Sequence, residues 1–101
     1  MIEHIRLSHP ALMVLKCFLA DVKTPLCGVD IVDAIGTPPG SLYPMLRRFE
    51  DAGWLSSKWE TASPKKLGRP RRRLYRMTKD GRKLAADAFK DLGLLPGRSA
   101  Q

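Results

Sequence analysis

Apolar residues recur with helical spacing in the first half of the chain and with strand spacing after residue 54. Nearly every position from 11 to 20 is apolar, which predicts a helix over residues 11–22 with Ser8 as its N-cap and Pro10 in its first turn. A helix that rests on one core needs only an apolar stripe. We therefore expect the surplus apolar face of this helix to meet another subunit.

Two further helices are predicted before residue 54. One covers residues 29–35 and ends at Gly36. The next follows a tight connection over residues 37–40, with Ser41 as its N-cap. Pro44 then occupies an early-turn position where its missing N–H costs no hydrogen bond. The apolar stripe of this helix has the spacing i, i+3, i+4 and i+7 and consists of Leu42, Met45, Leu46 and Phe49.

From residue 54 the pattern changes to alternation, which predicts a β-hairpin with a long polar tip rich in Pro and Gly. We expect Trp59, Tyr75 and Met77 to anchor the hairpin on the core. Thr78 has the side chain of an N-cap for a last helix over about residues 79–92, and we expect residues 94–101 to form a frayed tail.

Together these elements predict a mainly α fold with a small antiparallel β-hairpin, in the order helix, helix, helix, strand, strand, helix. A chain of 101 residues has room for one modest core, so residues 1–101 are expected to form a single domain. The closely spaced second and third helices followed by a hairpin are typical of a winged helix-turn-helix domain, with the wing at about residues 54–77.

The balance of charge favours an anionic partner. Lys and Arg number 18 against 10 Asp and Glu, which gives a formal net charge of +8 and points to nucleic acid or an anionic membrane surface. No apolar run approaches the roughly 18 to 20 residues that span a bilayer, so we expect no membrane segment. Cys17 and Cys27 lack the spacing of a metal set, so we expect reduced thiols, no metal and no cofactor. A disulfide or thiol switch is the rival interpretation of the cysteines.

The third predicted helix offers a candidate surface for DNA. Since its apolar stripe faces the core, its outward residues form a set able to contact phosphates and, through an arginine, guanine in the major groove. From this segment alone, a solvated amphipathic helix is the simpler interpretation. The outward set is Gly40, Ser41, Tyr43, Pro44, Arg47 and Arg48.

The charge of the hairpin makes nucleic-acid contact the favoured interpretation. Between Thr61 and Lys79 the sequence holds no acidic residue. Such a density of like charge repels itself, and its position is easiest to understand if phosphates neutralise it. Residues 68–70 also form a short cationic segment that suits the minor groove, although a simple turn explains them equally well. The basic residues of the hairpin are Lys65, Lys66, Arg69, Arg71, Arg72, Arg73, Arg76 and Lys79.

Catalysis is not expected. The histidines, His4 and His9, lie near the N-terminus, without a nucleophile and an orienting carboxylate that the sequence would place beside them. The sequence also lacks a phosphate-binding glycine loop and a carboxylate cluster suited to a metal. We therefore expect a binding protein.

Residues 40–55, Gly-Ser-Leu-Tyr-Pro-Met-Leu-Arg-Arg-Phe-Glu-Asp-Ala-Gly-Trp-Leu, resemble the third helix of PadR-type transcriptional regulators. The likeness continues through residues 59–60, 68–70 and 72–78 and at Gly81. It implies a bacterial or phage-encoded cytoplasmic repressor that dimerises through its first and last helices. It also implies DNA contact by Ser41, Tyr43, Pro44 and Arg47 or Arg48 in the major groove and by the wing arginines.

From this resemblance we expect a homodimer on a palindromic operator. The dimer interface is expected to consist of Leu12, Leu15, Phe18, Leu19, Phe89 and Leu92. Many relatives carry a longer C-terminal region, so a small-molecule effector is doubtful. Alternatives are a nucleic-acid binder without sequence preference, architectural or RNA-directed, and a winged helix that binds an acidic protein.

Overall fold

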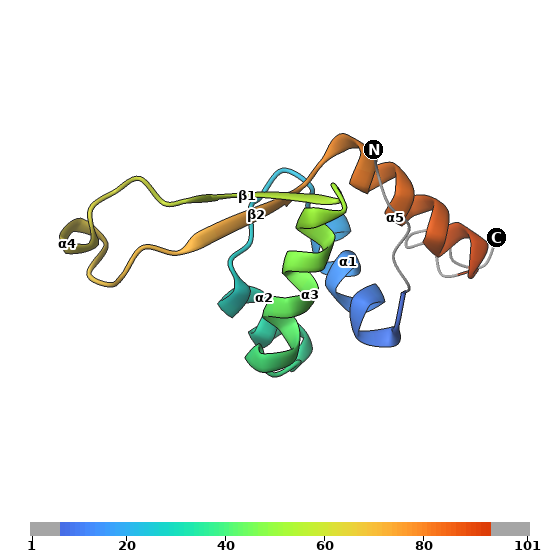
Figure 1. Ribbon diagram of the computed structural model, residues 1–101, viewed down its shortest axis with the longest axis horizontal. Coiled ribbons are helices and arrows are strands. Elements are labelled where there is room, and N and C mark those ends of the chain that lie inside the picture. The colour runs from blue at the N-terminus through green and yellow to red at the C-terminus, as the bar shows by residue number, and fades with distance from the viewer. Residues whose placement is uncertain (1–6, 94–101) are drawn as a thin grey trace.

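The computed structural model describes residues 7–93. Its elements follow one another as α1 (His9–Ala20), α2 (Gly28–Ile35), α3 (Pro39–Asp51), β1 (Leu55–Trp59), α4 (Pro64–Leu67), β2 (Arg73–Met77) and α5 (Lys79–Asp91). The helices α1, α2, α3 and α5 form the body, and the hairpin extends from it with α4 at its far end (Figure 1). The predicted fold class, mainly α with one antiparallel hairpin, is confirmed. No helix between residues 7 and 93 is long and apolar enough to cross a membrane.

The apolar stripe predicted for α3 forms the centre of the core. All of its members are buried, and they join buried residues of α1 and α5 in one cluster. Phe49, at the end of the stripe, contacts the ring of Trp54 with 5.3 Å between ring centroids. Because this stripe faces inward, the opposite face of α3 is left on the surface.

The core also takes up residues that the sequence had assigned to a dimer interface. Leu15, Phe18 and Phe89 are 0%, 2% and 3% exposed, so each side chain is already covered within one protomer. The expectation is therefore wrong for these residues, because α5 packs on α1 and satisfies the face that looked unpartnered. Leu12 and Leu19 are partly covered, and Leu92 is 55% exposed.

Helix α3 begins earlier than the sequence predicted. Pro38 is the N-cap and Pro39 is the first helical residue, whereas Ser41 already lies inside the helix and its N–H donates to the Pro38 carbonyl at 3.0 Å. Proline at the first position has a suitable φ and needs no hydrogen bond, which explains the earlier start. Pro44 consequently lies within the helix, and the Gly40 carbonyl lacks its usual intrahelical donor.

The strands pair in a register that continues from the core out into solvent. Leu55 pairs with Met77, Ser57 with Tyr75, and Trp59 with Arg73, all on one face of the hairpin. Tyr75 and Met77 are buried as predicted. Trp59, in contrast, is 57% exposed, so the prediction that it anchors the hairpin is wrong. It lies at the outer end of the paired strands, beyond the reach of the core.

Two features that the sequence did not indicate hold the hairpin in place. Leu26, in the loop before α2, forms a β-bridge with Tyr75 through reciprocal N–H to carbonyl bonds of 2.9 and 2.8 Å. At the tip, the expected irregular loop contains the one-turn helix α4, whose N-cap Ser63 accepts from the Lys66 N–H at 3.2 Å. The wing is therefore an ordered arm along its length.

The junction between the hairpin and α5 depends on a close backbone contact. Thr78 is the N-cap of α5, accepting from the Gly81 N–H at 2.8 Å, and its hydroxyl donates to the Gly53 carbonyl at 2.7 Å. Gly81 lies directly against the Trp54 backbone, where a Cβ would overlap the carbonyl group. Glycine at this position lets the start of α5 pack against the turn between α3 and β1.

We predict that Gly81→Ala lowers the free energy of unfolding by about 1–3 kcal/mol or more, because a backbone carbonyl cannot move aside as a side chain does. Urea unfolding followed by circular dichroism measures this change. Gly40→Ala is the control, since no atom lies within 4 Å of its Cβ position. Equal stability of the two variants would contradict the packing described for α5.

Candidate nucleic-acid interface

The outward face of α3 carries the residues expected to read DNA. Ser41, Tyr43, Pro44, Arg47 and Arg48 are all exposed. The Arg47 side chain is 83% exposed, and its Nε lies 3.9 Å from Asp51, a loose surface pair that contributes little. The outward side chains of α3 are thus accessible to a partner, as the sequence predicted for this face.

Tyr43 is positioned by an unusual contact with α2. It is 44% exposed, and its phenol ring lies over Gly28, where a Cβ would overlap the ring. The start of α2 is fixed by Asp30, which accepts from the Cys27 N–H at 3.0 Å and from the Cys27 Sγ at 3.3 Å. Both cysteines, Cys17 and Cys27, are free. The absence of a side chain at residue 28 therefore decides where the Tyr43 hydroxyl lies.

Arg73 links the hairpin to α3. Its Nε donates to Ser57 Oγ at 2.7 Å, and its terminal nitrogen lies 3.6 Å from Glu50. Ser57 in turn donates to Glu50 at 2.5 Å. The Arg73 guanidinium also lies over the Trp59 ring, 5.5 Å from its centroid. This chain of contacts fixes the angle between the wing and α3.

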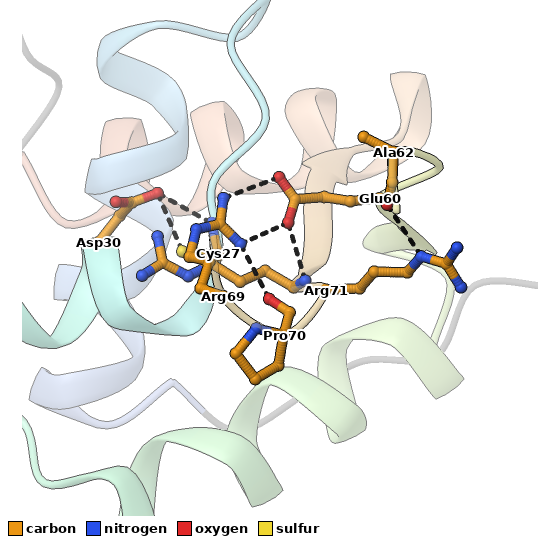
Figure 2. A network of polar contacts seen from close by, with 8 residues as sticks. Cys27, Asp30, Glu60, Ala62, Arg69, Pro70 and Arg71 are labelled. Atoms are coloured by element: carbon orange, nitrogen blue, oxygen red, sulfur yellow. Dashed lines mark hydrogen bonds and ion pairs between the residues drawn. The ribbon is translucent and has the colours of Figure 1, made fainter. Parts of the chain in front are cut away.

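Glu60 holds the base of the wing tip (Figure 2). Its carboxylate makes a bidentate ion pair with Arg69, at 2.7 and 3.1 Å, and accepts from the Arg72 N–H at 2.8 Å. The side-chain bond from Arg69 and the backbone bond from Arg72 lower the pKa of Glu60 to about 2. The same pair raises the pKa of Arg69. The carboxylate therefore stays ionised at neutral pH.

This ion pair shows where Arg69, one of the residues expected to contact DNA, lies in the structure. Its guanidinium is bound to Glu60 and, at 3.0 Å, to the Pro70 carbonyl. It therefore holds the wing tip together, whereas a side chain that probes the minor groove would point outward. Reasoning from the sequence missed Glu60, although the signal was present as the carboxylate at the edge of the basic run. Arg71 is partly engaged as well, since its Nε donates to the Ala62 carbonyl at 3.0 Å.

Several basic side chains of the wing make no hydrogen bond or ion pair within the part of the chain that the structure describes, and they are available to a partner. Within residues 7–93, these side chains are Lys58, Lys65, Lys66, Arg72 and Arg76. Lys65 and Lys66 lie on α4 at the far end of the wing (Figure 1). Between the wing and α3 the surface is hollowed. This hollow is lined by Tyr43, Arg47, Glu50, Asp51, Arg73 and Tyr75.

Comparison with known families assigns the chain. A family model described as the transcriptional regulator PadR-like family matches residues 22–87. The chain belongs to the PadR-like family. The matched region of this PadR-like protein runs from the start of the loop after α1 through most of α5 and includes α2, α3 and the wing. No curated protein matches the chain.

Solved structures share this fold. The PadR-like protein is 29% identical to smu.1704 of Streptococcus mutans UA159, with a TM-score of 0.65 over 91% of this chain and 85% of that one. It is 24% identical to a PadR-like transcription factor from Bacteroides fragilis, with a TM-score of 0.61 over 80% and 84% of the two chains. Overoxidized AbfR bound to DNA is 17% identical, with a TM-score of 0.69, over 85% of this chain and 57% of AbfR.

We predict that the carboxyl group of Glu60 titrates at about 2. Because its pKa is lowered in the folded protein, the ion pair stabilises the wing above the ordinary glutamate range and is lost as the pH falls towards 2. Carbon-13 NMR of the side-chain carboxyl measures the midpoint. Arg69→Ala should return the midpoint towards about 4.3, whereas Lys66→Ala, which removes a tip charge without touching Glu60, should leave it unchanged. A midpoint of the native protein in the ordinary range would refute the bidentate pair.

We further predict that Gly28→Ala displaces the Tyr43 ring and changes the free energy of unfolding by less than about 1 kcal/mol, because the obstacle is a movable surface side chain. Nuclear Overhauser contacts between residue 28 and the Tyr43 ring report the displacement. Retention of these contacts in the alanine variant would show that Gly28 does not position Tyr43.

Proposed function

We propose that this protein is a sequence-specific DNA-binding regulator, a repressor that binds a palindromic operator as a homodimer. The observation that carries the proposal is the shared hollow between α3 and the wing. Tyr43 and Arg47 of α3 and Arg73 of β2 line the same depression, together with Tyr75 and with Asp51 and Glu50, the carboxylates that pair with Arg47 and Arg73. Donors from the two elements of a winged helix thus converge on one region, as they must to hold a duplex.

The two elements take different tasks in this proposal. Helix α3 enters the major groove, where Arg47 or Arg48 donates to guanine and Ser41, Tyr43 and Pro44 define the fit. The wing holds the phosphate backbone through Arg72, with Lys65 and Lys66 reaching further along the duplex. The presence of DNA in the AbfR structure, which shares this fold, supports duplex DNA as the ligand.

Dimerisation is proposed through α1 and α5. Leu15, Phe18 and Phe89 are buried within one protomer, so of the six side chains expected at the interface only Leu12, Leu19 and Leu92 are partly or largely exposed to a partner. A two-fold axis through this surface would bring two copies of α3 to half-sites about one helical turn apart. The regulator acts in the cytoplasm, where its DNA lies, and the proposal includes no small-molecule effector.

Selection of bound duplexes from a random pool tests the function. We expect an inverted repeat to be enriched, because a two-fold dimer presents the same α3 surface to both half-sites. If the dimer neutralises about 6 to 10 phosphates, its affinity falls about 10³- to 10⁵-fold between about 50 and 200 mM salt. Enrichment of no sequence, together with equal competition by random duplex or RNA, would favour a binder without sequence preference. Failure to bind any nucleic acid at low salt would favour a protein-interaction role.

Matched variants separate the reading helix from the wing. Arg48→Ala should weaken the selected duplex by about 1–3 kcal/mol and relax the preference at one base pair, if Arg48 is the arginine on guanine. Lys65→Ala should weaken selected and random duplexes alike, because it contacts phosphate. Each variant removes one exposed cation, so net charge is matched. An equal loss on both duplexes for Arg48→Ala and for Arg47→Ala would remove the reading role from α3.

A further inference from the structure

The large apolar side chains on the surface of the protein are not scattered. Within residues 7–93 they are Val29, Tyr43, Trp59 and Leu92. Leu92 lies at the end of α5, on the proposed dimer side. The other three line a single hollow where the start of α2, α3 and the outer end of the paired strands meet. A gathered apolar surface of this kind indicates a contact with a partner.

The rim of this hollow is cationic. Arg71, Arg72 and Arg73 complete its lining, together with Cys27 and Gly28, and no carboxylate is among the described residues that line it. Arg71 and Arg73 are held by protein contacts, whereas the Arg72 guanidinium makes no hydrogen bond or ion pair within residues 7–93. An apolar surface beside a guanidinium that makes no hydrogen bond fits a sugar–phosphate chain, in which the apolar faces of the sugar rings alternate with phosphates.

Trp59 is held in place although it is exposed. It belongs to the hairpin face that carries Leu55 and Ser57, and it continues that face beyond the core. Arg73, its partner across the strands, lies over the indole ring. The ring therefore loses little conformational freedom on binding, and contact with a ligand removes apolar surface from water.

We propose that this hollow seats one strand of the bound duplex, with the Trp59 indole against a deoxyribose and the Arg72 guanidinium on the adjoining phosphate. The inference rests on the proposed function and deepens it by naming the contact. Neither the sugar nor the phosphate carries base identity, so Trp59 contributes affinity for selected and random duplexes alike. Tyr43 and Arg73 line both this hollow and the one between α3 and the wing, so the two hollows lie side by side.

Tryptophan fluorescence gives a direct test in the full chain. Of the two tryptophans, Trp54 is 3% exposed and Trp59 is 57% exposed, so quenching by acrylamide reports mainly on Trp59. We expect saturating duplex to reduce this quenching in the native protein and to have no effect on it in Trp59→Phe. Trp59→Ala should weaken binding of selected and random duplexes about tenfold, the scale set by burial of an indole face.

Controls distinguish this contact from general damage. Leu74→Ala truncates an apolar side chain on the opposite face of the hairpin and should leave DNA affinity within about twofold. The unfolding midpoint of Trp59→Ala should match that of the native protein, because the side chain lies outside the core. Salt-dependent duplex binding by the native protein, without protection of Trp59 and without loss in Trp59→Ala, would overturn this inference and leave the proposed function standing. Binding of no duplex would overturn both, and equal protection of Trp59 by polyglutamate would replace duplex DNA with an acidic protein as the occupant.

Discussion

Burial of one apolar stripe on α3 determines both the surface that this helix presents and the point from which the wing extends. With Leu42, Leu46 and Phe49 inside, the polar half of the helix has to face solvent. The last member of the stripe contacts Trp54, so the first strand of the hairpin starts against the same core. The wing and the outward face of α3 are therefore placed relative to each other by packing, before any ligand is present.

A second constraint is the charge of the wing. A hairpin with so many cations would spread its tip by repulsion, and the Glu60 carboxylate opposes this by joining Arg69 to the Arg72 backbone (Figure 2). The basic residues consequently fall into two groups. Arg69, Arg71 and Arg73 make contacts within the protein, whereas the half-buried Arg72 and the exposed α4 lysines make no hydrogen bond or ion pair through their side chains in the described part of the chain. Rigidity matters because a preorganised arm loses less entropy when it binds.

The sequence pattern predicted the features that depend on residues close together in the chain. The helices, the strands and the buried stripe of α3 follow from periodicity, and the caps at Ser8 and Thr78 follow from side-chain chemistry. Apart from the start of α3, which the local conformation of Pro39 decides, errors arose where segments distant in the sequence decide the structure. Packing of α5 on α1 covered Phe18 and its neighbours, and Leu26 joined the hairpin from a loop without any strand signal. For the candidate site, exposure of the α3 set was predictable from the stripe. The pairing of Arg69 with Glu60 was not, because a basic run gives no indication of which member is already bound.

Tyr43 connects the parts of the site. Its ring rests on Gly28 of α2, and it lines both the hollow beside Arg47 and the hollow beside Trp59. A duplex strand that follows these hollows would pass from the wing to α3 across this one side chain. Under the proposed function, sequence reading and backbone contact would be coupled through Tyr43, whose position is set by the absence of a Cβ at Gly28 of α2.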